Sequence, residues 1–257
     1  MTDPRALVLD MEGVLHVDWD VLPGAADAVR SLAGAGIELA VLTNTTGHTR
    51  ASISERLGGM GIPIPADRIV TAASATAAYL REHAAGPVFA LLEPAALEEL
   101  AGVELVSAPA DAEVIVLGGP DARWTYPAMN EVFRALHRGA ALVAMHRNRW
   151  WTTSSGPALD AGMYVSGLEY STGVRATVIG KPSPAIYETA CALAGAEPAG
   201  AMMVGDDLES DLRPAAALGM ATCLVRTGKG ASFAPEPGEV DLVCDDLAAL
   251  ARLLLDG

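Results

Sequence analysis

Short apolar runs rich in valine, leucine and isoleucine alternate along this chain with alanine-rich segments of helical period. Four of the runs lie at residues 6–9, 38–42, 176–179 and 201–204. A segment of helical period follows the first run, at 25–33, and is closed by Gly34 and Gly36. Apolar runs of this length between helices are typical of a parallel sheet covered by helices, so the pattern predicts an α/β fold.

The middle of the chain has its own strands and helices. Residues 88–92, 113–117 and 141–145 are predicted strands, and residues 94–101 and 126–138 are predicted helices. We interpret residues 79–179 as an inserted domain between a first core part at 1–78 and a second at 180–257. Alternating residues at 15–22 predict a short hairpin, and residues 246–255 a final helix.

Composition and charge exclude several classes of protein. The 257 residues are 51% hydrophobic, which is enough for a large buried core. The net charge of −15 argues against nucleic acid as a partner, because such binding needs clustered cations. No apolar run approaches the roughly 18 residues of a membrane span. The first apolar run reaches Asp10 too soon for a signal peptide. We therefore expect a cytoplasmic protein with neither a nucleic-acid nor a membrane partner.

The cysteines and lysines are informative because they are few. Cys191, Cys223 and Cys244 are far apart and odd in number, so neither a disulfide framework nor a zinc site is indicated, and we expect buried thiols. Lys181 and Lys229 are the only lysines among 17 basic residues. Lysine is therefore not routine surface charge in this chain, and we expect each one to have a specific role.

Polar residues able to do chemistry follow each of the four apolar runs. They are Asp10, then Thr43 with Asn44, then Lys181, and then Asp206 and Asp207 with Asp211. The carboxyl ends of parallel strands share one edge of a sheet, where ligands bind, so these residues are expected to converge. Each one alone is also explained as a capping or turn residue, and Asp211 also as an acid on a helix surface.

Crowded carboxylates need a compensating cation, because close like charges raise one another's pKa. Oxygen ligands without histidine or cysteine clusters favour a hard cation, so we predict Mg²⁺. Beside such a metal, a carboxylate can attack a phosphoryl group and divide a difficult hydrolysis into two easier steps. Thr43 and Asn44 are candidates to hold phosphate oxygens, and Lys181 to offset the negative charge. Ser183 as N-cap and Pro184 as first residue predict a helix with Lys181 at its mouth.

The order of these motifs resembles the haloacid dehalogenase superfamily of phosphatases. The four motifs are Asp10-Met11-Glu12-Gly13-Val14, Leu42-Thr43-Asn44, Gly180-Lys181-Pro182, and Gly205-Asp206-Asp207 with Asp211. The Gly-Lys-Pro form, the Thr-Asn-Thr triplet and the insertion between the second and third motifs resemble subclass IIA. Residues 167–182 and 225–229 are similar to the branch that holds phospholysine phosphohistidine inorganic pyrophosphate phosphatase and its haloacid dehalogenase-like relatives. The similarity spans nearly the whole chain.

The resemblance implies a Rossmann-like three-layer core around a parallel sheet, with an inserted α/β cap of the C2 type. The cap would act as a lid that excludes water and supplies specificity. The resemblance also implies that Asp10 is the nucleophile, Thr43 a phosphate ligand and Lys181 the orienting cation. It implies metal ligation by Asp10, Asp206 and the backbone carbonyl of Glu12, with support from Asp207 and Asp211.

Glu12 departs from the family's usual pattern. The family usually has an aspartate two residues after the nucleophile, which acts as general acid on the leaving group and then as base for water. The glutamate carboxyl group reaches roughly 1.5 Å further, and a misplacement near 1 Å can cost on the order of 10²-fold in rate. Glu12 still serves if the local backbone absorbs the extra length. Phosphoramidates, pyrophosphate and aryl phosphates remain accessible because their leaving groups need little protonation.

The densest basic and aromatic cluster lies in the predicted cap, at residues 146–151. Within it, Arg147 and Trp150 are candidates for recognising an anionic or planar leaving group. The alternative is a surface loop whose tryptophans pack against the cap or against a dimer partner. Tyr170, near the return from the cap, is a candidate for lining the entrance. Subclass IIA caps often dimerise, so a homodimer through the cap is a further expectation.

Two functions from different classes follow. The first is a Mg²⁺-dependent phosphatase of small phosphorylated metabolites that works through a phospho-aspartyl enzyme, with P–N and pyrophosphate bonds as further targets. The second, motivated by Glu12, is a catalytically weak module of the same fold that binds a phosphorylated ligand or a protein partner. A response-regulator receiver also combines aspartate, threonine and lysine around Mg²⁺, but it is about half this length and leaves the insertion unexplained.

Overall fold

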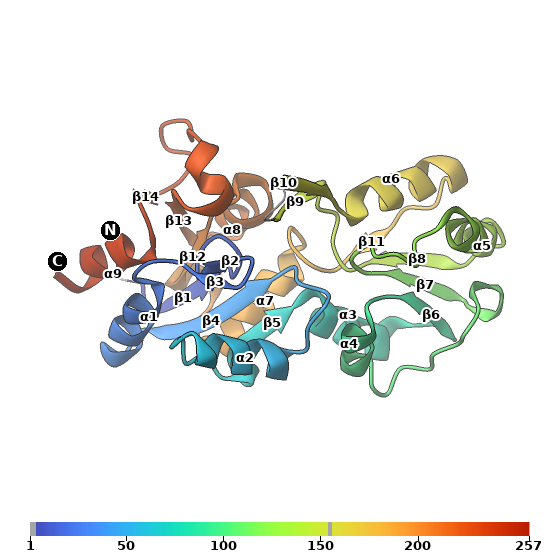
Figure 1. Cartoon of the computed structure of the whole chain (residues 1–257), viewed down its shortest axis with the longest axis horizontal. Helices are drawn as coiled ribbons and strands as arrows, with labels where there is room; N and C mark the ends of the chain where they lie inside the picture. The colour runs from blue at the N-terminus through green and yellow to red at the C-terminus, as the bar shows by residue number, and fades with distance from the viewer. Residues whose placement is uncertain (1–3, 154–155, 257) are drawn as a thin grey trace. The chain divides into compact units, whose positions relative to one another are not determined.

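The computed structural model describes residues 4–153 and 156–256, and the chain divides into two compact units (Figure 1). The first unit comprises Met1–Thr43, Arg50–Val70 and Lys181–Gly257. The second comprises Asn44–Thr49 and Thr71–Gly180. Each unit has its own sheet and its own apolar core, so the two are described separately.

A six-stranded sheet of order β14-β13-β12-β1-β4-β5 forms the centre of the first unit. Pairing is parallel from β14 to β4, and β1 lies between β12 and β4. The four residues of β1 are all buried, as the run without polar interruptions predicts for a central parallel strand. The strands are β1 (Ala6–Leu9), β4 (Glu38–Thr43), β5 (Ile69–Thr71), β12 (Ala201–Gly205), β13 (Ala221–Val225) and β14 (Leu242–Cys244).

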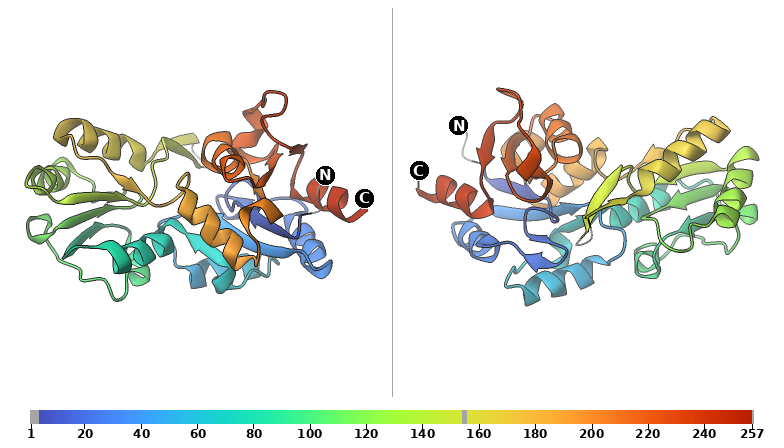
Figure 2. Two further views of the ribbon diagram at one scale, coloured as in Figure 1. Left: turned by 180° about the vertical axis from the view of Figure 1, so that it is seen from behind. Right: turned by 45° about the horizontal axis from the view of Figure 1, so that its top comes forward.

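Helices cover this sheet and complete the three layers (Figure 2). The helices α1 (Ala25–Gly34), α2 (Arg50–Gly59) and α9 (Leu247–Asp256) place Leu32, Leu57 and Leu250 in one core with alternate residues of β1, Leu7 and Leu9. The helix α7 (Pro184–Leu193) packs against β1 and β4, and α8 (Arg213–Ala217) packs against β13. Helical turns η1 (Ala66–Arg68), η3 (Pro198–Gly200), η4 (Leu208–Leu212) and η5 (Gly228–Ser232) join the larger elements.

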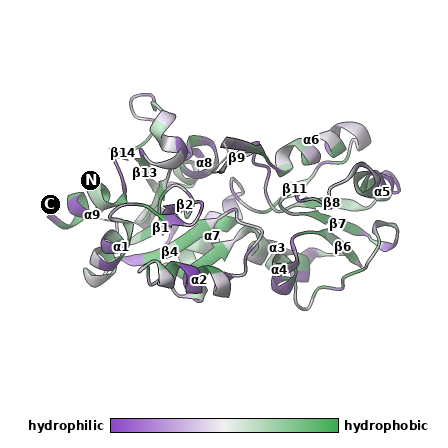
Figure 3. Ribbon diagram, viewed as in Figure 1, coloured by the Kyte–Doolittle hydropathy of each residue, from purple (hydrophilic) through white to green (hydrophobic). Residues whose placement is uncertain are grey.

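A four-stranded parallel sheet of order β11-β8-β7-β6 forms the centre of the second unit. Its strands consist mainly of hydrophobic residues, like those of the first sheet (Figure 3). Leu92 and Leu80 belong to the core on one face, and Leu136 and Val165 to the core on the other. The strands are β6 (Val88–Leu91), β7 (Val114–Leu117), β8 (Ala141–Ala144) and β11 (Thr177–Val178); the helices are α3 (Ala72–His83), α4 (Pro94–Glu99), α5 (Tyr126–His137), α6 (Ala161–Thr172) and the turn η2 (Pro109–Asp111).

Two antiparallel ribbons are separate from these sheets. The predicted hairpin forms as β2 (His16–Val17) with β3 (Asp20–Val21), directly after β1. The second ribbon pairs β9 (Trp150–Thr153) with β10 (Gly156–Leu159) in the second unit. It begins at Trp150, which the sequence analysis named as a candidate for recognising the leaving group.

The predicted fold class is confirmed: parallel sheets with helices make up both units. Two predictions for the run at 176–179 disagreed: the shared edge of strand ends placed it in the first sheet, and the insertion at 79–179 placed it in the second domain. The run forms β11, which pairs with β8 of the second sheet, so the first of these was wrong. Periodicity does not report which sheet a short apolar run will join, since that depends on long-range pairing. The predicted boundary at residue 79 falls inside α3, which belongs wholly to the second unit.

The helices of the described residues reach at most 12 residues, as in α3, α5 and α6. Within residues 4–153 and 156–256, none combines the length and the hydropathy needed to span a bilayer.

Candidate active site

Two aspartates come together because the strands that precede them are neighbours. Leu9 of β1 lies opposite Val204 of β12, and the chain then continues to Asp10 and Asp206 respectively. The Asp10 amide donates to the Val204 carbonyl at 2.9 Å, which extends the ladder to the catalytic candidate. Both carboxylates are buried, with 7% and 5% exposure. Parallel register therefore brings together two acids that are 196 positions apart in the sequence.

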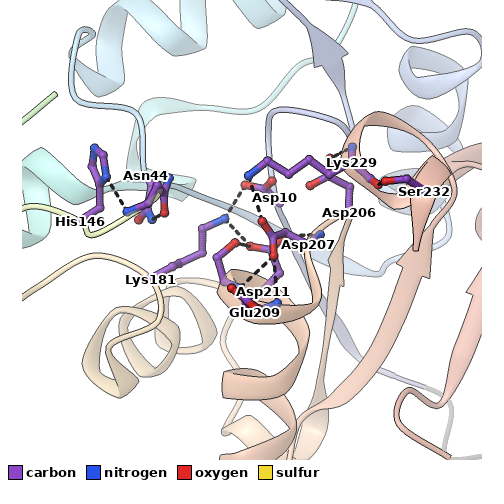
Figure 4. A network of polar contacts seen from close by, with 12 residues as sticks. Asp10, Asn44, His146, Lys181, Asp206, Asp207, Glu209, Asp211, Lys229 and Ser232 are labelled. Carbon is purple, nitrogen blue, oxygen red and sulfur yellow. Dashed lines mark hydrogen bonds and ion pairs between the residues drawn. The ribbon is translucent and has the colours of Figure 1, made fainter. Parts of the chain in front are cut away.

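Lys181 joins this pair to a third acid, Asp211 (Figure 4). The Lys181 ammonium donates to Asp10 Oδ1 at 2.6 Å and to Asp211 Oδ1 at 2.7 Å. Asp211 lies in η4, directly after β12, and its side chain is fully buried. The alternative interpretation of Asp211 as a surface acid was therefore wrong. Its buried ion pair with lysine makes it part of the cluster.

Burial and the neighbouring charges shift the pKa values of this cluster. Burial raises the pKa of Asp10 to about 7; Lys181 opposes this shift and Asp211 adds to it. Burial also raises the pKa of Asp206 well above its ordinary value, and Asp10 and Asp211 add to that shift. Burial alone would lower the pKa of Lys181, but the two carboxylates that it contacts raise it. One lysine therefore does not fully compensate these acids.

Lys229 is a further cation of the site, and the sequence did not assign it a role there. Its amide donates to Asp206 Oδ2 at 2.7 Å, and its ammonium donates to Asp207 Oδ2 at 2.9 Å. The sequence contained a signal for this role, because Lys229 is the only lysine besides Lys181. Lys229 lies in η5, after β13, so a third strand of the sheet contributes to this edge.

Asp207 faces Lys229, and its carboxylate also begins the next helical turn. Its Oδ1 accepts from the Glu209 amide at 2.9 Å and from the Ser210 amide at 3.2 Å. Lys229 and these amides lower the pKa of Asp207 although burial opposes the shift. The carboxylates that the structure brings together as a potential metal site are those of Asp10, Asp206 and Asp211, without Asp207.

Two glycines allow the backbone to approach the Asp206 carboxylate. A β-carbon on Gly13 would lie 2.0 Å from Asp206 Oδ2, and one on Gly228 would lie 2.1 Å from the same atom. Both residues have positive φ, +87° and +51°, which favours glycine in addition. These turns therefore hold the Asp206 carboxylate in one place.

Glu12 lies beside this cluster, but its carboxylate contacts the hairpin. Its Oε1 accepts from the Asp18 amide at 2.8 Å, and its Oε2 lies 3.1 Å from His16 Nδ1. The Glu12 side chain is 41% exposed, whereas the three clustered aspartates are buried. The sequence predicted the hairpin, and it did not predict that the hairpin would hold this carboxylate.

Thr43 and Asn44 are placed by the end of β4. Thr43 is the last residue of that strand and is buried, on the neighbour of the strand that leads to Asp10. Asn44 is the first residue of the second unit, and its side-chain amide donates to the Asn148 side-chain oxygen at 3.2 Å. Their roles as phosphate ligands stay predictions.

Arg147 has a partner inside the second unit. Its guanidinium donates to Glu169 Oε2 at 2.6 Å, and the buried Glu169 also accepts from the Ala176 amide at 3.0 Å. Trp150 is 42% exposed at the start of β9, and Tyr170 is 92% exposed on α6. Substrate binding by Arg147 and Trp150 stays a prediction, and the geometry gives Arg147 a structural role.

The donor set fits a hard divalent cation. Oxygen atoms of Asp10, Asp206 and Asp211, one from each, lie within 4.8 Å of one another, and all three residues are buried. Carboxylate oxygens are the ligands that Mg²⁺ prefers. The three acids carry three negative charges when ionised, and Lys181 offsets one of them. A divalent cation would offset the other two. The raised pKa values of Asp10 and Asp206 are consistent with this need, because they indicate that Lys181 alone does not neutralise the site.

Known proteins resemble this chain over most of its length. The family model of the haloacid dehalogenase-like hydrolases matches residues 7–106, and a related hydrolase model matches residues 178–250. The human haloacid dehalogenase-like hydrolase domain-containing protein 2 is 34% identical over 225 residues, which cover 88% of this chain and 85% of that protein. Phospholysine phosphohistidine inorganic pyrophosphate phosphatase of Danio rerio is 32% identical over 259 residues, covering 98% and 94%. The structure of a p-nitrophenyl phosphatase from Archaeoglobus fulgidus superposes with a TM-score of 0.88 at 28% identity, covering 98% and 99%.

Proposed function

This chain belongs to the haloacid dehalogenase-like hydrolase family, subclass IIA, and we propose that it is a Mg²⁺-dependent phosphatase of small phosphorylated metabolites. The observation that carries the proposal is the buried cluster of Asp10, Asp206 and Asp211 with Lys181. Relatives named as phosphatases support the reaction class.

The proposed first step is attack of an Asp10 carboxylate oxygen on the phosphorus of the substrate. The new bond makes an acyl phosphate on Asp10, and the bond from phosphorus to the leaving group breaks, so the leaving group departs with the electron pair. Water then attacks the phosphorus of the acyl phosphate, and the bond from phosphorus to the Asp10 oxygen breaks. Inorganic phosphate leaves, the carboxylate is restored, and the proton that water loses goes to solvent. The Asp10–Lys181 contact keeps Asp10 oriented, and the lysine charge offsets that of an incoming phosphate.

Asp10 and Asp206, with the Glu12 carbonyl and Asp211, would hold Mg²⁺. When bound, the ion supplies positive charge that brings the Asp10 carboxylate and a phosphate together despite their like charges. Thr43 and Asn44 are the proposed donors to phosphate oxygens. Asp207 takes part through Lys229 in this proposal, because its carboxylate is committed to that ammonium.

The relatives extend the range of substrates that should be tested. One is named as acting on phospholysine, phosphohistidine and inorganic pyrophosphate, and another on p-nitrophenyl phosphate. We propose phosphate monoesters as the main substrates of this chain, with P–N and pyrophosphate bonds as further candidates. A cytoplasmic location and a homodimer through the second unit are part of the proposal.

The test is phosphate release from a panel of aryl phosphates, sugar phosphates, nucleotides, pyrophosphate and phosphoramidates, with Mg²⁺ or with chelator. Asp10→Asn removes the nucleophile. Asp67→Asn is the matched control, because Asp67 is an exposed acid in η1. Release that needs Mg²⁺, disappears in Asp10→Asn and persists in Asp67→Asn would support the proposal.

Equal release by the wild type and Asp10→Asn on every substrate would refute the phosphatase. The alternative, a module that binds a phosphorylated ligand without turnover, would then be tested by calorimetry with the same panel. Binding of a phosphorylated compound at the wild-type site without release would favour that alternative.

A further inference from the structure

The Glu12 carboxylate makes two contacts with one short loop. The Asp18 amide donates to Oε1 at 2.8 Å, and His16 Nδ1 lies 3.1 Å from Oε2. Both partners belong to the hairpin that begins four residues after Glu12. Both carboxylate oxygens therefore have a contact in the hairpin, and Glu12 does not belong to the group formed by Asp10, Asp206 and Asp211.

The His16 ring is held firmly enough to act as an anchor. It is fully buried and stacks on Trp19, with ring centroids 4.6 Å apart and planes inclined by 17°. The guanidinium of Arg56 lies over the Trp19 ring, 4.1 Å from its centroid. His16 Nε2 is buried with no hydrogen-bond partner among the described residues. His16 Nδ1 lies between two groups of this loop: it is 3.1 Å from Glu12 Oε2, and it accepts from the Trp19 amide at 3.3 Å.

The turn that these contacts stabilise has an unusual backbone. Asp18 and Trp19 have φ of 50° and 65°, in the left-handed region that side-chain-bearing residues rarely adopt. Such conformations persist only where the surroundings over-determine them. The Glu12 carboxylate provides that constraint at Asp18. The His16 ring provides it at Trp19, through the stack and through Nδ1, which accepts from the Trp19 amide at 3.3 Å.

The same loop is tied to the metal-binding candidates. The Gly13 amide donates to the His16 carbonyl at 2.7 Å, and the Thr227 hydroxyl donates to the Gly13 carbonyl. Gly13 in turn packs against the Asp206 carboxylate so closely that a β-carbon would clash. The hairpin that the Glu12 carboxylate contacts is therefore tied, through the next residue Gly13, to Asp206 of the candidate metal site.

We propose that the Glu12 side chain is a positioning residue that locks the hairpin through His16 and the Asp18 amide, and that it does not protonate the leaving group. This inference rests on the proposed phosphatase function. It identifies a substrate class: phosphate compounds whose leaving groups depart without protonation by the enzyme, such as aryl phosphates, in preference to alkyl phosphates.

The decisive experiment compares kcat/KM for p-nitrophenyl phosphate and for an alkyl phosphate in the wild type and in Glu12→Gln. Glutamine has the same shape and still accepts from the Asp18 amide, but it cannot donate a carboxyl proton. We expect the ratio of the two kcat/KM values to stay within about 10-fold of the wild-type ratio. General acid catalysis contributes on the order of 10²- to 10⁴-fold, so a selective loss of more than about 10-fold on the alkyl phosphate would overturn the proposal.

A second pair of variants tests the anchor by metal binding. His16→Leu removes the polar nitrogen that lies between Glu12 and the Trp19 amide, whereas His16→Asn keeps a polar side-chain amide near the position of Nδ1. We expect the Mg²⁺-induced rise in melting temperature to need a several-fold higher Mg²⁺ concentration in His16→Leu, and His16→Asn to recover most of the loss. Unchanged Mg²⁺ dependence in His16→Leu would contradict the positioning role.

The outcomes also separate this proposal from the proposed function. If the wild type releases no phosphate in an Asp10-dependent manner, the phosphatase fails, while the Mg²⁺ melting series still tests the anchor. If the wild type is active and Glu12→Gln loses activity selectively on the alkyl phosphate, the phosphatase stands and the positioning role fails.

Discussion

Replacing Lys181 by methionine removes the cation that contacts both Asp10 and Asp211 while keeping a side chain of similar length. The lysine is 3% exposed, and its ammonium lies 2.6 and 2.7 Å from the two carboxylates. Removing one partner of a buried ion pair costs about 3–5 kcal/mol, because the remaining charges stay buried without compensation. At about 2–4 °C per kcal/mol for a protein of this size, we expect the melting temperature of the metal-free protein to fall by roughly 10 °C.

The loss should depend on pH in a defined direction. The pKa of Asp10 is raised from 3.8 to about 7, so the folded protein binds this proton more tightly than the unfolded chain. The stability that this protonation contributes is complete below pH 4 and is lost as the pH rises through about 7. A protonated Asp10 leaves less uncompensated charge. The Lys181→Met variant should therefore lose more stability at pH 8 than at pH 5.

Lys229→Met is the matched control, since it removes the other lysine of the chain. Its ammonium contacts Asp207, which two backbone amides also hold, so we expect less than half the loss. The assay is thermal unfolding followed by circular dichroism, in chelator, at pH 5 and pH 8. An equal fall in both variants, or a larger fall at pH 5 in Lys181→Met, would refute the argument that the cluster is undercompensated.

Three further predictions use the same materials. Asp10→Asn should raise the free energy of unfolding of the metal-free protein at pH 8 and leave it unchanged at pH 4. The gain at pH 8 is up to about 4 kcal/mol, because burial raises the pKa of Asp10 from 3.8 to about 7. Urea titrations at both pH values measure this difference. Gly13→Ala should raise the Mg²⁺ concentration for half-activation about 10-fold or more, because the added β-carbon would clash with Asp206. Gly36→Ala is its control and should change only stability, since Gly36 has a similar φ and no neighbour within 4 Å. A Mg²⁺ titration in which both variants respond alike would contradict this prediction. Arg147→Met should lower the melting temperature by a few degrees with unchanged KM for p-nitrophenyl phosphate, and a raised KM at unchanged melting temperature would instead support substrate binding.

The strands could be predicted from the sequence because a parallel strand that is buried on both faces consists of consecutive apolar residues. The runs before Asp10, Thr43 and Asp206 are uninterrupted and apolar, and each became a strand of the first sheet. The run before Lys181 looks the same locally, yet it pairs with the second sheet. The periodicity and composition of a segment indicate that it is buried, but they do not indicate which strand it pairs with.

The sequence by itself determined the fold class, the acids at the strand ends and the family, because these depend on local runs and on the order of motifs. Only the tertiary structure decided the partners: Lys181 with Asp10 across 171 positions, Lys229 with Asp207, and Arg147 with Glu169. It also buried Asp211 and turned the Glu12 carboxylate to the hairpin. The physical reason is that an ion pair or hydrogen bond needs atoms within about 3 Å, and such distances arise from chain packing rather than from the neighbouring residues in sequence.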